Sequence, residues 1–257
     1  MNDMIEKERF SPAMQLAILL IAFGVCYIIG GLITITVASA YLHQPAGTVL
    51  SNPKLIEENA TLSRILQVSV SFCMFGLPAI IFAFIINKQK GLSVLGFNRA
   101  VSGRQVLYAA IIIVAALWVS DALGLLNQII PVPAHNAAYF KQLEDEYTSQ
   151  TVTLLDMKDF GGYLMSLFII GLLPAVLEEL IFRACLQKIL IGLSKNAFLG
   201  IFITSLAFAW IHFSYYGFLS RFFLGIVLGY MFYYSKNIWF NAGFHLINNS
   251  IGVTLIY

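Results

Sequence analysis

Charged residues are scarce in this sequence. Only 11% of its 257 residues are Asp, Glu, Lys or Arg, whereas soluble domains contain about 25%. Hydrophobic residues make up 59%, and the mean hydropathy is +0.82. This composition excludes an ordinary soluble domain and predicts a polytopic membrane protein whose surface contacts membrane lipid. The net charge of +2 is too small to indicate a nucleic-acid partner, so we expect none.

Cysteine is rare, and internal repeats are missing. Cys26, Cys73 and Cys185 lie in apolar surroundings without metal-ligand spacing, so we interpret them as small core residues. No period of about 20–50 residues recurs along the chain, and no low-complexity stretch is present. The sequence therefore gives no sign of a repeat architecture.

Long stretches with few or no charges recur at the ~20-residue length that a membrane-spanning helix needs. The first is much longer than a signal-peptide core, so we expect an uncleaved anchor there, although Ala38-Ser39-Ala40 resembles a cleavage site. The pattern predicts an all-α fold, a polytopic transmembrane helix bundle of about seven to eight spans. The predicted spans are Met14–Leu42, Leu66–Ile86, Val106–Leu125, Tyr163–Ile191, Ala197–Phe213, Phe222–Tyr234 and Ile238–Tyr257.

The spans group into three segments of what we expect to be a single integral membrane domain. Residues 1–105 hold the N-terminal spans and a basic loop, residues 106–162 the third span and an acidic connector, and residues 163–257 a compact core of four helices. Short loops make neighbouring helices in this core antiparallel. The distribution of Lys and Arg between the loops favours an N-terminus in the cytoplasm.

Two adjacent acidic residues stand inside the apolar run 163–191. A charged side chain at the centre of a spanning helix costs about 2.5–3.5 kcal/mol, so Glu178 and Glu179 are by default a functional-site hypothesis. Glu179 and Arg183 are four residues apart and share a helix face, so an ion pair can offset their burial. Glu178 points about 100° away and has no such partner, which makes it the better candidate for a general base.

Three further polar side chains lie in the last spans. His212 ends the run 197–213, while His245 and Asn249 are four residues apart and can both meet a single oxygen atom. Taken alone, His212 fits an interfacial anchor, Asn249 an inter-helix hydrogen bond, and Glu179 with Arg183 a structural pair. The presence of all six side chains on three of the last four spans favours one joint site.

At this point the chain resembles a known family, the CAAX-protease and bacteriocin-processing (Abi) membrane endopeptidases. Three motifs carry the resemblance, in order and on separate predicted spans within residues 160–257, and no motif position departs from the family pattern. The first three spans match only in being hydrophobic. The motifs are Glu178-Glu179-x-x-x-Arg183, Phe208-x-x-x-His212 and His245-x-x-x-Asn249.

The resemblance implies hydrolysis of a peptide bond inside the membrane. It implies that Glu178, helped by His212, activates a water molecule, and that His245 and Asn249 donate hydrogen bonds to the oxyanion. Glu179 and Arg183 would support the first carboxylate. The side-chain chemistry agrees, because the chain offers a buried acid and neutral donors but no serine or cysteine beside a base.

Other functions stay open at this stage. Two histidines and a carboxylate also satisfy a catalytic zinc site, whose ligands would be Glu178, His212 and His245. We favour the reading without a cofactor, because no helix carries two histidines and an asparagine is a poor zinc ligand. A proton-coupled transporter would use Glu178 as its titrating group, although such proteins usually contain paired repeats. A non-enzymatic immunity or scaffold protein would keep only the fold.

The expected partners follow from the same observations. We expect membrane lipid around the bundle and a peptide or protein substrate inside it. The sequence leaves the identity of that substrate, its prenylation and the oligomeric state open. The expected location is a bacterial plasma membrane, which the chain crosses several times.

Overall fold

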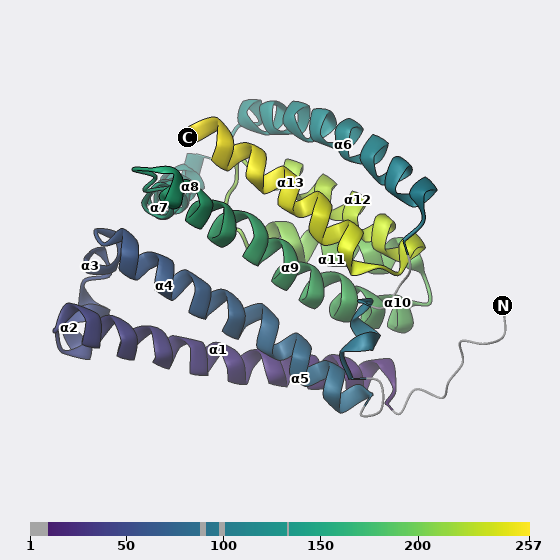
Figure 1. The fold of residues 1–257 in the computed structure, drawn as a ribbon, viewed down its shortest axis with the longest axis horizontal. Helices are drawn as coiled ribbons and strands as arrows, with labels where there is room; N and C mark the ends of the chain where they lie inside the picture. Colours follow the sequence, from purple (N-terminus) through teal and green to yellow (C-terminus); the bar gives the residue numbers. More distant parts are fainter. Residues whose placement is uncertain (1–9, 88–90, 98–100, 133) are drawn as a thin grey trace.

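The computed structural model describes residues 10–87, 91–97, 101–132 and 134–257. Every regular element within these residues is helical, so the predicted all-α fold is confirmed (Figure 1). The charged head of the chain and several Lys and Arg residues of the basic loop, on which the predicted orientation depends, lie outside the described residues.

The helices follow one another closely along the chain. Two long helical segments contain π-helix, at 72–76 in the segment Ala60–Ile86 and at 167–172 and 180–187 in the segment Phe160–Ser194. Short 3-10 turns occupy 91–95 and 134–136. The α-helices are α1 (Pro12–Leu42), α2 (Ala46–Ser51), α3 (Lys54–Glu57), α4 (Ala60–Ser71), α5 (Leu77–Ile86), α6 (Gly103–Ile129), α7 (Ala137–Leu154), α8 (Phe160–Ser166), α9 (Leu173–Glu179), α10 (Lys188–Ser194), α11 (Ala197–Trp210), α12 (Phe218–Ser235) and α13 (Ile238–Ile256).

A Lys-Asn pair reverses the chain at two corners of the C-terminal core. Lys195 ends α10 and Lys236 ends α12, both in the left-handed region with φ of 55° and 54°. The next residue starts the following helix, because the Asn196 and Asn237 side chains accept hydrogen bonds from backbone N–H groups of its first turn. These two tight corners make the predicted antiparallel neighbours.

The seven predicted spans all correspond to helical segments, but fewer qualify as spans by length and hydropathy. Among the described residues, five helical segments are long and apolar enough to cross a membrane. The other two are α11 and α13. With 14 residues at about 1.5 Å per residue, α11 is shorter than the ~30 Å hydrocarbon core. The chain is an integral membrane protein, and within the described residues five of the seven predicted spans meet both the length and the hydropathy criterion. The five segments are Pro12–Leu42, Ala60–Ile86, Gly103–Ile129, Phe160–Ser194 and Phe218–Ser235.

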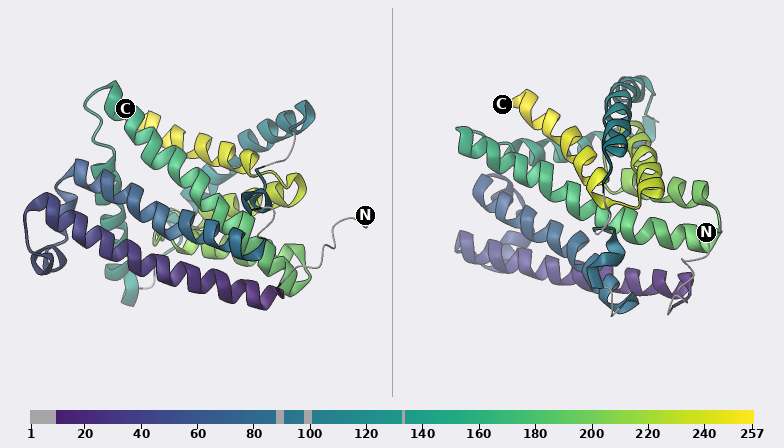
Figure 2. Two further views of the ribbon diagram at one scale, coloured as in Figure 1. Left: turned by 60° about the horizontal axis from the view of Figure 1, so that its bottom comes forward. Right: turned by 45° about the vertical axis from the view of Figure 1, so that its right-hand side comes forward.

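The span Phe160–Ser194 lies in the middle of the bundle. On one side α1 and the joined helices α4 and α5 lie side by side in all three views (Figures 1 and 2). On the other side α11, α12 and α13 pack together, and α6 covers α12 from outside. Phe182, Phe208 and Phe232 belong to the main apolar core, which joins both sides. The central span therefore carries its acids inside protein and away from lipid.

The acidic connector is more ordered than the sequence suggests. Much of it forms helix α7, an 18-residue helix that packs against α4. Arg64 of α4 fixes the end of α7, because its guanidinium donates to the Leu154 carbonyl at 3.0 and 3.2 Å and to the Asp156 carbonyl at 2.8 Å. A cation at the C-terminus of a helix also opposes the negative end of its dipole. The contact brings α7 to the edge of the cavity described next.

Candidate active site

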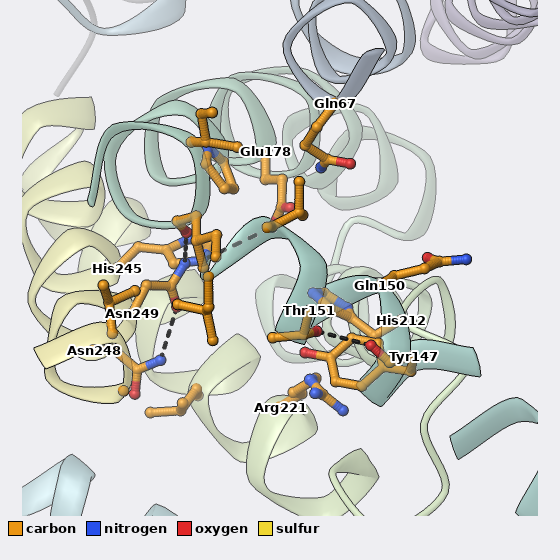
Figure 3. A pocket seen from close by; sticks show the side chains of 18 of the residues that line it. Gln67, Tyr147, Gln150, Thr151, Glu178, His212, Arg221, His245, Asn248 and Asn249 are labelled. Carbon is orange, nitrogen blue, oxygen red and sulfur yellow. Dashed lines mark hydrogen bonds and ion pairs between the residues drawn. The ribbon is translucent and has the colours of Figure 1, made fainter. Parts of the chain in front are cut away.

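A cavity of about 440 Å³ opens among the helices around the two acids (Figure 3). Its walls come from α4, α7, α9, α11, α12 and α13. Four of the side chains singled out in the sequence line it together: Glu178, His212, His245 and Asn249. Glu179 and Arg183 lie behind this wall and are fully buried.

The helix that carries the acids is irregular on both sides of them. The π-helical stretch 167–172 precedes α9, and another at 180–187 follows Glu179. Such wide turns interrupt the regular i to i−4 hydrogen bonds and are frequent at functional sites. Pro174 has no N–H, so the Ile170 carbonyl lacks its i+4 donor and accepts a hydrogen bond from the Asn249 amide at 3.0 Å.

Glu179 is held on three sides. Its Oε2 lies 3.2 Å from Arg183 Nε and accepts a hydrogen bond from Asn241 Nδ2 at 3.1 Å. Its Oε1 lies 3.2 Å from His245 Nδ1. The ion pair predicted from the four-residue spacing is present, and both of its side chains have no solvent exposure. The guanidinium of Arg183 also lies 4.7 Å above the ring of Phe208.

Glu178 has a neighbour that the sequence did not reveal. Its Oε2 lies 3.8 Å from His245 Nε2, which gives this acid a neighbour from another helix. Spacing along its own helix could not indicate this neighbour, because His245 comes from α13. The same Oε2 is buried and accepts no hydrogen bond from any described residue. His245 therefore stands between two carboxylates, bonded to one and facing the other.

His212 follows the end of α11 and lines the cavity from another side. Its Nδ1 lies 2.8 Å from the Phe208 carbonyl. A carbonyl only accepts hydrogen bonds, so Nδ1 carries the proton and Nε2 of the neutral ring carries the lone pair. His212 is therefore a proton acceptor at Nε2 and, when neutral, not a donor there.

The three residues of the zinc alternative come from different parts of the bundle. Within the described ranges, no three His, Cys, Asp or Glu side chains are grouped as they would be around a metal ion. The proposed zinc ligands Glu178, His212 and His245 line one cavity without forming such a cluster.

Sequence reasoning missed four residues of this region. Asn241 lies four residues before His245 and shares its face, which was a usable signal. Gln67 and Tyr147 come from segments that were read as a plain span and a connector. Arg221 was not singled out, although it is a cation inside a candidate span.

The fold and the cavity show what kind of protein this is. It is an integral membrane protein whose bundle holds a site of buried acids and histidines. Residues 160–251 match the family model of the Rce1-like type II CAAX prenyl endopeptidases. The match covers the three motifs and confirms the resemblance to the CAAX-protease family over this region. It supports a membrane endopeptidase of the CAAX-protease type. No curated protein and no solved structure matches the chain significantly.

Proposed function

We propose that the protein is an intramembrane endopeptidase that hydrolyses a peptide bond with water activated by Glu178 and His212. The observation that carries this proposal is the arrangement of His245 between Glu178 and Glu179 at the wall of the cavity. Buried groups of this kind are costly in a membrane protein, and a catalytic role accounts for them.

The first step is the activation of water. Glu178 lines the cavity with 11% of its side chain exposed, so a water there can donate to the exposed part of its carboxylate, while the buried Oε2 faces His245. His212 Nε2 is a second acceptor on the same cavity. As the water attacks the scissile carbonyl, its proton passes to Glu178 and a C–O bond forms. Positioned proton transfer of this kind contributes typically ~10²–10⁴-fold to the rate.

The second step is the stabilisation of the oxyanion. His245 donates from Nδ1 to Glu179, so its Nε2 carries a hydrogen only when the ring is protonated. The state with ionised Glu178 and protonated His245 therefore supplies the base and a donor together. Asn249 uses one N–H on the Ile170 carbonyl, and its second N–H remains for the oxyanion.

The last step is the release of the amine. The tetrahedral intermediate collapses, the C–N bond breaks, and the proton held by Glu178 moves to the leaving nitrogen. Glu179, Arg183 and Asn241 touch no reacting atom in this scheme. They act as positioning residues, because they fix the ring of His245 through Glu179.

A reconstituted cleavage assay tests the proposal. The purified protein is placed in lipid vesicles with a mixture of peptides, and the products are identified by mass spectrometry. We expect the unaltered protein to cleave one or more of these peptides and the Glu178→Gln variant to cleave none. Proton uptake that depends on Glu178, without any cleavage, would instead favour the transporter. Absence of both activities would favour a non-enzymatic protein with the family fold.

We also propose that the protein lies in a bacterial plasma membrane with a cytoplasmic N-terminus. The five spans support the membrane location, and the Lys and Arg distribution supports the orientation. A reporter fused to the N-terminus, with labelling of single cysteines from each side, would measure this orientation.

A further inference from the structure

Arg221 is a cation on the cavity wall without a role in the reaction described above. It belongs to the first turn of α12 and lines the same cavity as Glu178. Figure 3 places it beside Tyr147, on the opposite side of the cavity from Glu178 and Gln67. Its guanidinium carbon lies 5.0 Å from the centroid of the Tyr147 ring.

The positive charge of Arg221 forms no close ion pair with any described residue, although it interacts electrostatically with Glu178 across the cavity. In the part of the chain that the structure describes, no acid forms an ion pair with it, and its buried Nη1 has no hydrogen-bond partner. The nearby Glu144 accepts a hydrogen bond from Ser214 at 2.9 Å. The first turn of α12 contains no acidic residue, and the helix dipole adds positive potential there. The wall of the cavity therefore favours an anion.

The position of the guanidinium is fixed by its surroundings. Its side chain folds back over Gly217, the residue that caps α12. A methyl group at Gly217 would collide with Nη1 and lie 2.6 Å from Cζ. The Tyr147 ring packs against the guanidinium by a cation–π contact. Gly217 and Tyr147 thus hold the charge in place from two sides.

We propose that Arg221 binds a carboxylate of the peptide substrate. The inference rests on the proposed endopeptidase function and specifies its substrate class. A guanidinium can hold a carboxylate through two parallel hydrogen bonds, which fixes both position and orientation. With that end anchored at Arg221, the chain crosses the cavity to Glu178. The C-terminal carboxylate of a peptide and an acidic side chain offer the same chemistry.

The test measures binding separately from cleavage. Glu178→Gln protein in lipid nanodiscs is titrated with fluorescent heptapeptides that carry a cysteine, free or S-farnesylated, fourth from the C-terminus. Each peptide is made as a free acid and as a C-terminal amide. We expect the acid to bind about 10- to 100-fold more tightly, the range for a hydrogen-bonded charge. An amide whose last residue is aspartate shows whether a side chain can replace the terminal carboxylate.

Three variants in the same background assign the preference to Arg221. Arg221→Gln should bind the acid and the amide equally. Gly217→Ala keeps the charge of Arg221 but displaces its guanidinium, and it should reduce the preference for the acid over the amide. The protein should still fold, because the added methyl group collides only with the end of a flexible side chain. Lys195→Gln removes an exposed positive charge outside the cavity and should change nothing.

Two outcomes overturn the proposed site. One is equal affinity for acid and amide in the protein that retains Arg221, including no measurable binding of either. The other is a preference that survives Arg221→Gln. Cleavage of the same peptides by the protein with Glu178 intact is scored separately. Cleavage without a carboxylate preference therefore rejects the Arg221 site alone, and binding without cleavage rejects the endopeptidase proposal alone.

Discussion

The outer helix α6 and the central span Phe160–Ser194 are both apolar, yet they bury very different shares of their residues. Only 11% of the most apolar window of α6 is buried, against 50% for the central span. The outward side chains of α6 include Trp118 at 76% and Ile129 at 76% exposure. In a membrane protein such a surface faces lipid, which is as apolar as the side chains themselves.

The central span is surrounded by protein and contains buried charged side chains. Glu179 and Arg183 are fully buried and are paired with each other. Breaking such a pair is costly, because the partner remains as an uncompensated buried charge. By contrast, Asp121 of α6 is exposed, near the surface of the bundle. Hydropathy alone does not distinguish α6 from the central span. The two differ in whether protein or lipid surrounds their side chains.

The largest effect should come from removing one acid of the central span. We expect Glu178→Gln to lower turnover by at least ~10²–10⁴-fold while the protein stays folded, because an amide fills the same space but cannot take a proton from water. Asp121→Asn makes the same chemical change on α6 and should leave turnover unaltered. Rates of peptide cleavage in vesicles measure both. If Glu178→Gln kept more than about a tenth of the activity, Glu178 would not be the base.

The next largest effect concerns the buried ion pair. Arg183→Ala leaves Glu179 without its cation in a site with no solvent exposure, so we expect a loss of roughly 3–5 kcal/mol in the free energy of unfolding. Thermal unfolding in detergent should show much less folded protein. Lys195→Ala, at an exposed helix end, is the control. A variant that unfolds normally but is inactive would assign Arg183 a direct part in the reaction.

The two proposed oxyanion donors should behave as a unit. His245→Ala and Asn249→Ala should each lower turnover by about 10²–10³-fold with little change in apparent substrate affinity. The double variant should lose less than the product of the two factors, because both donors act on the same developing charge. Fully multiplicative losses would mean that the two residues act on different steps.

Metal analysis of the same proteins provides an independent check of His245. We expect no stoichiometric zinc that depends on this residue. If the unaltered protein carries one zinc ion per chain and His245→Ala loses it, then His245 is a ligand and the oxyanion assignment is wrong.

Some of this site could be predicted from the sequence, because a helix fixes which residues share a face. The spacing of Glu179 and Arg183 gave their ion pair, and charge-free runs gave the helices. The contact between Glu179 and His245 joins positions 66 residues apart on two helices. A single sequence carries no information about the register between helices, so this contact and the one between Glu178 and His245 had to come from the structure.

Helix α7 escaped prediction for a different reason. Its polar residues are typical of a connector, and none of its residues is buried. Tertiary contacts order it, chiefly through Arg64 at its C-terminal end. Tyr147 and Arg221 could not be linked before α7 was placed over the cavity. Local composition therefore predicted the core helices well and the cavity wall poorly.

The smallest effect is expected from a substitution on the lipid-facing surface of α6. Leu107 of α6 is 58% exposed, and Leu180 of the central span is 5% exposed. Leu180→Ala should cost about 2–5 kcal/mol of unfolding free energy, because it leaves a void in packed protein. Leu107→Ala should stay within about 0.5 kcal/mol, because lipid fills the space of the lost side chain in folded and unfolded states alike. Thermal unfolding in matched lipid nanodiscs compares the two. A large loss for Leu107→Ala would mean that protein, such as a second copy of the chain, covers α6 and that its exposed face is an interface.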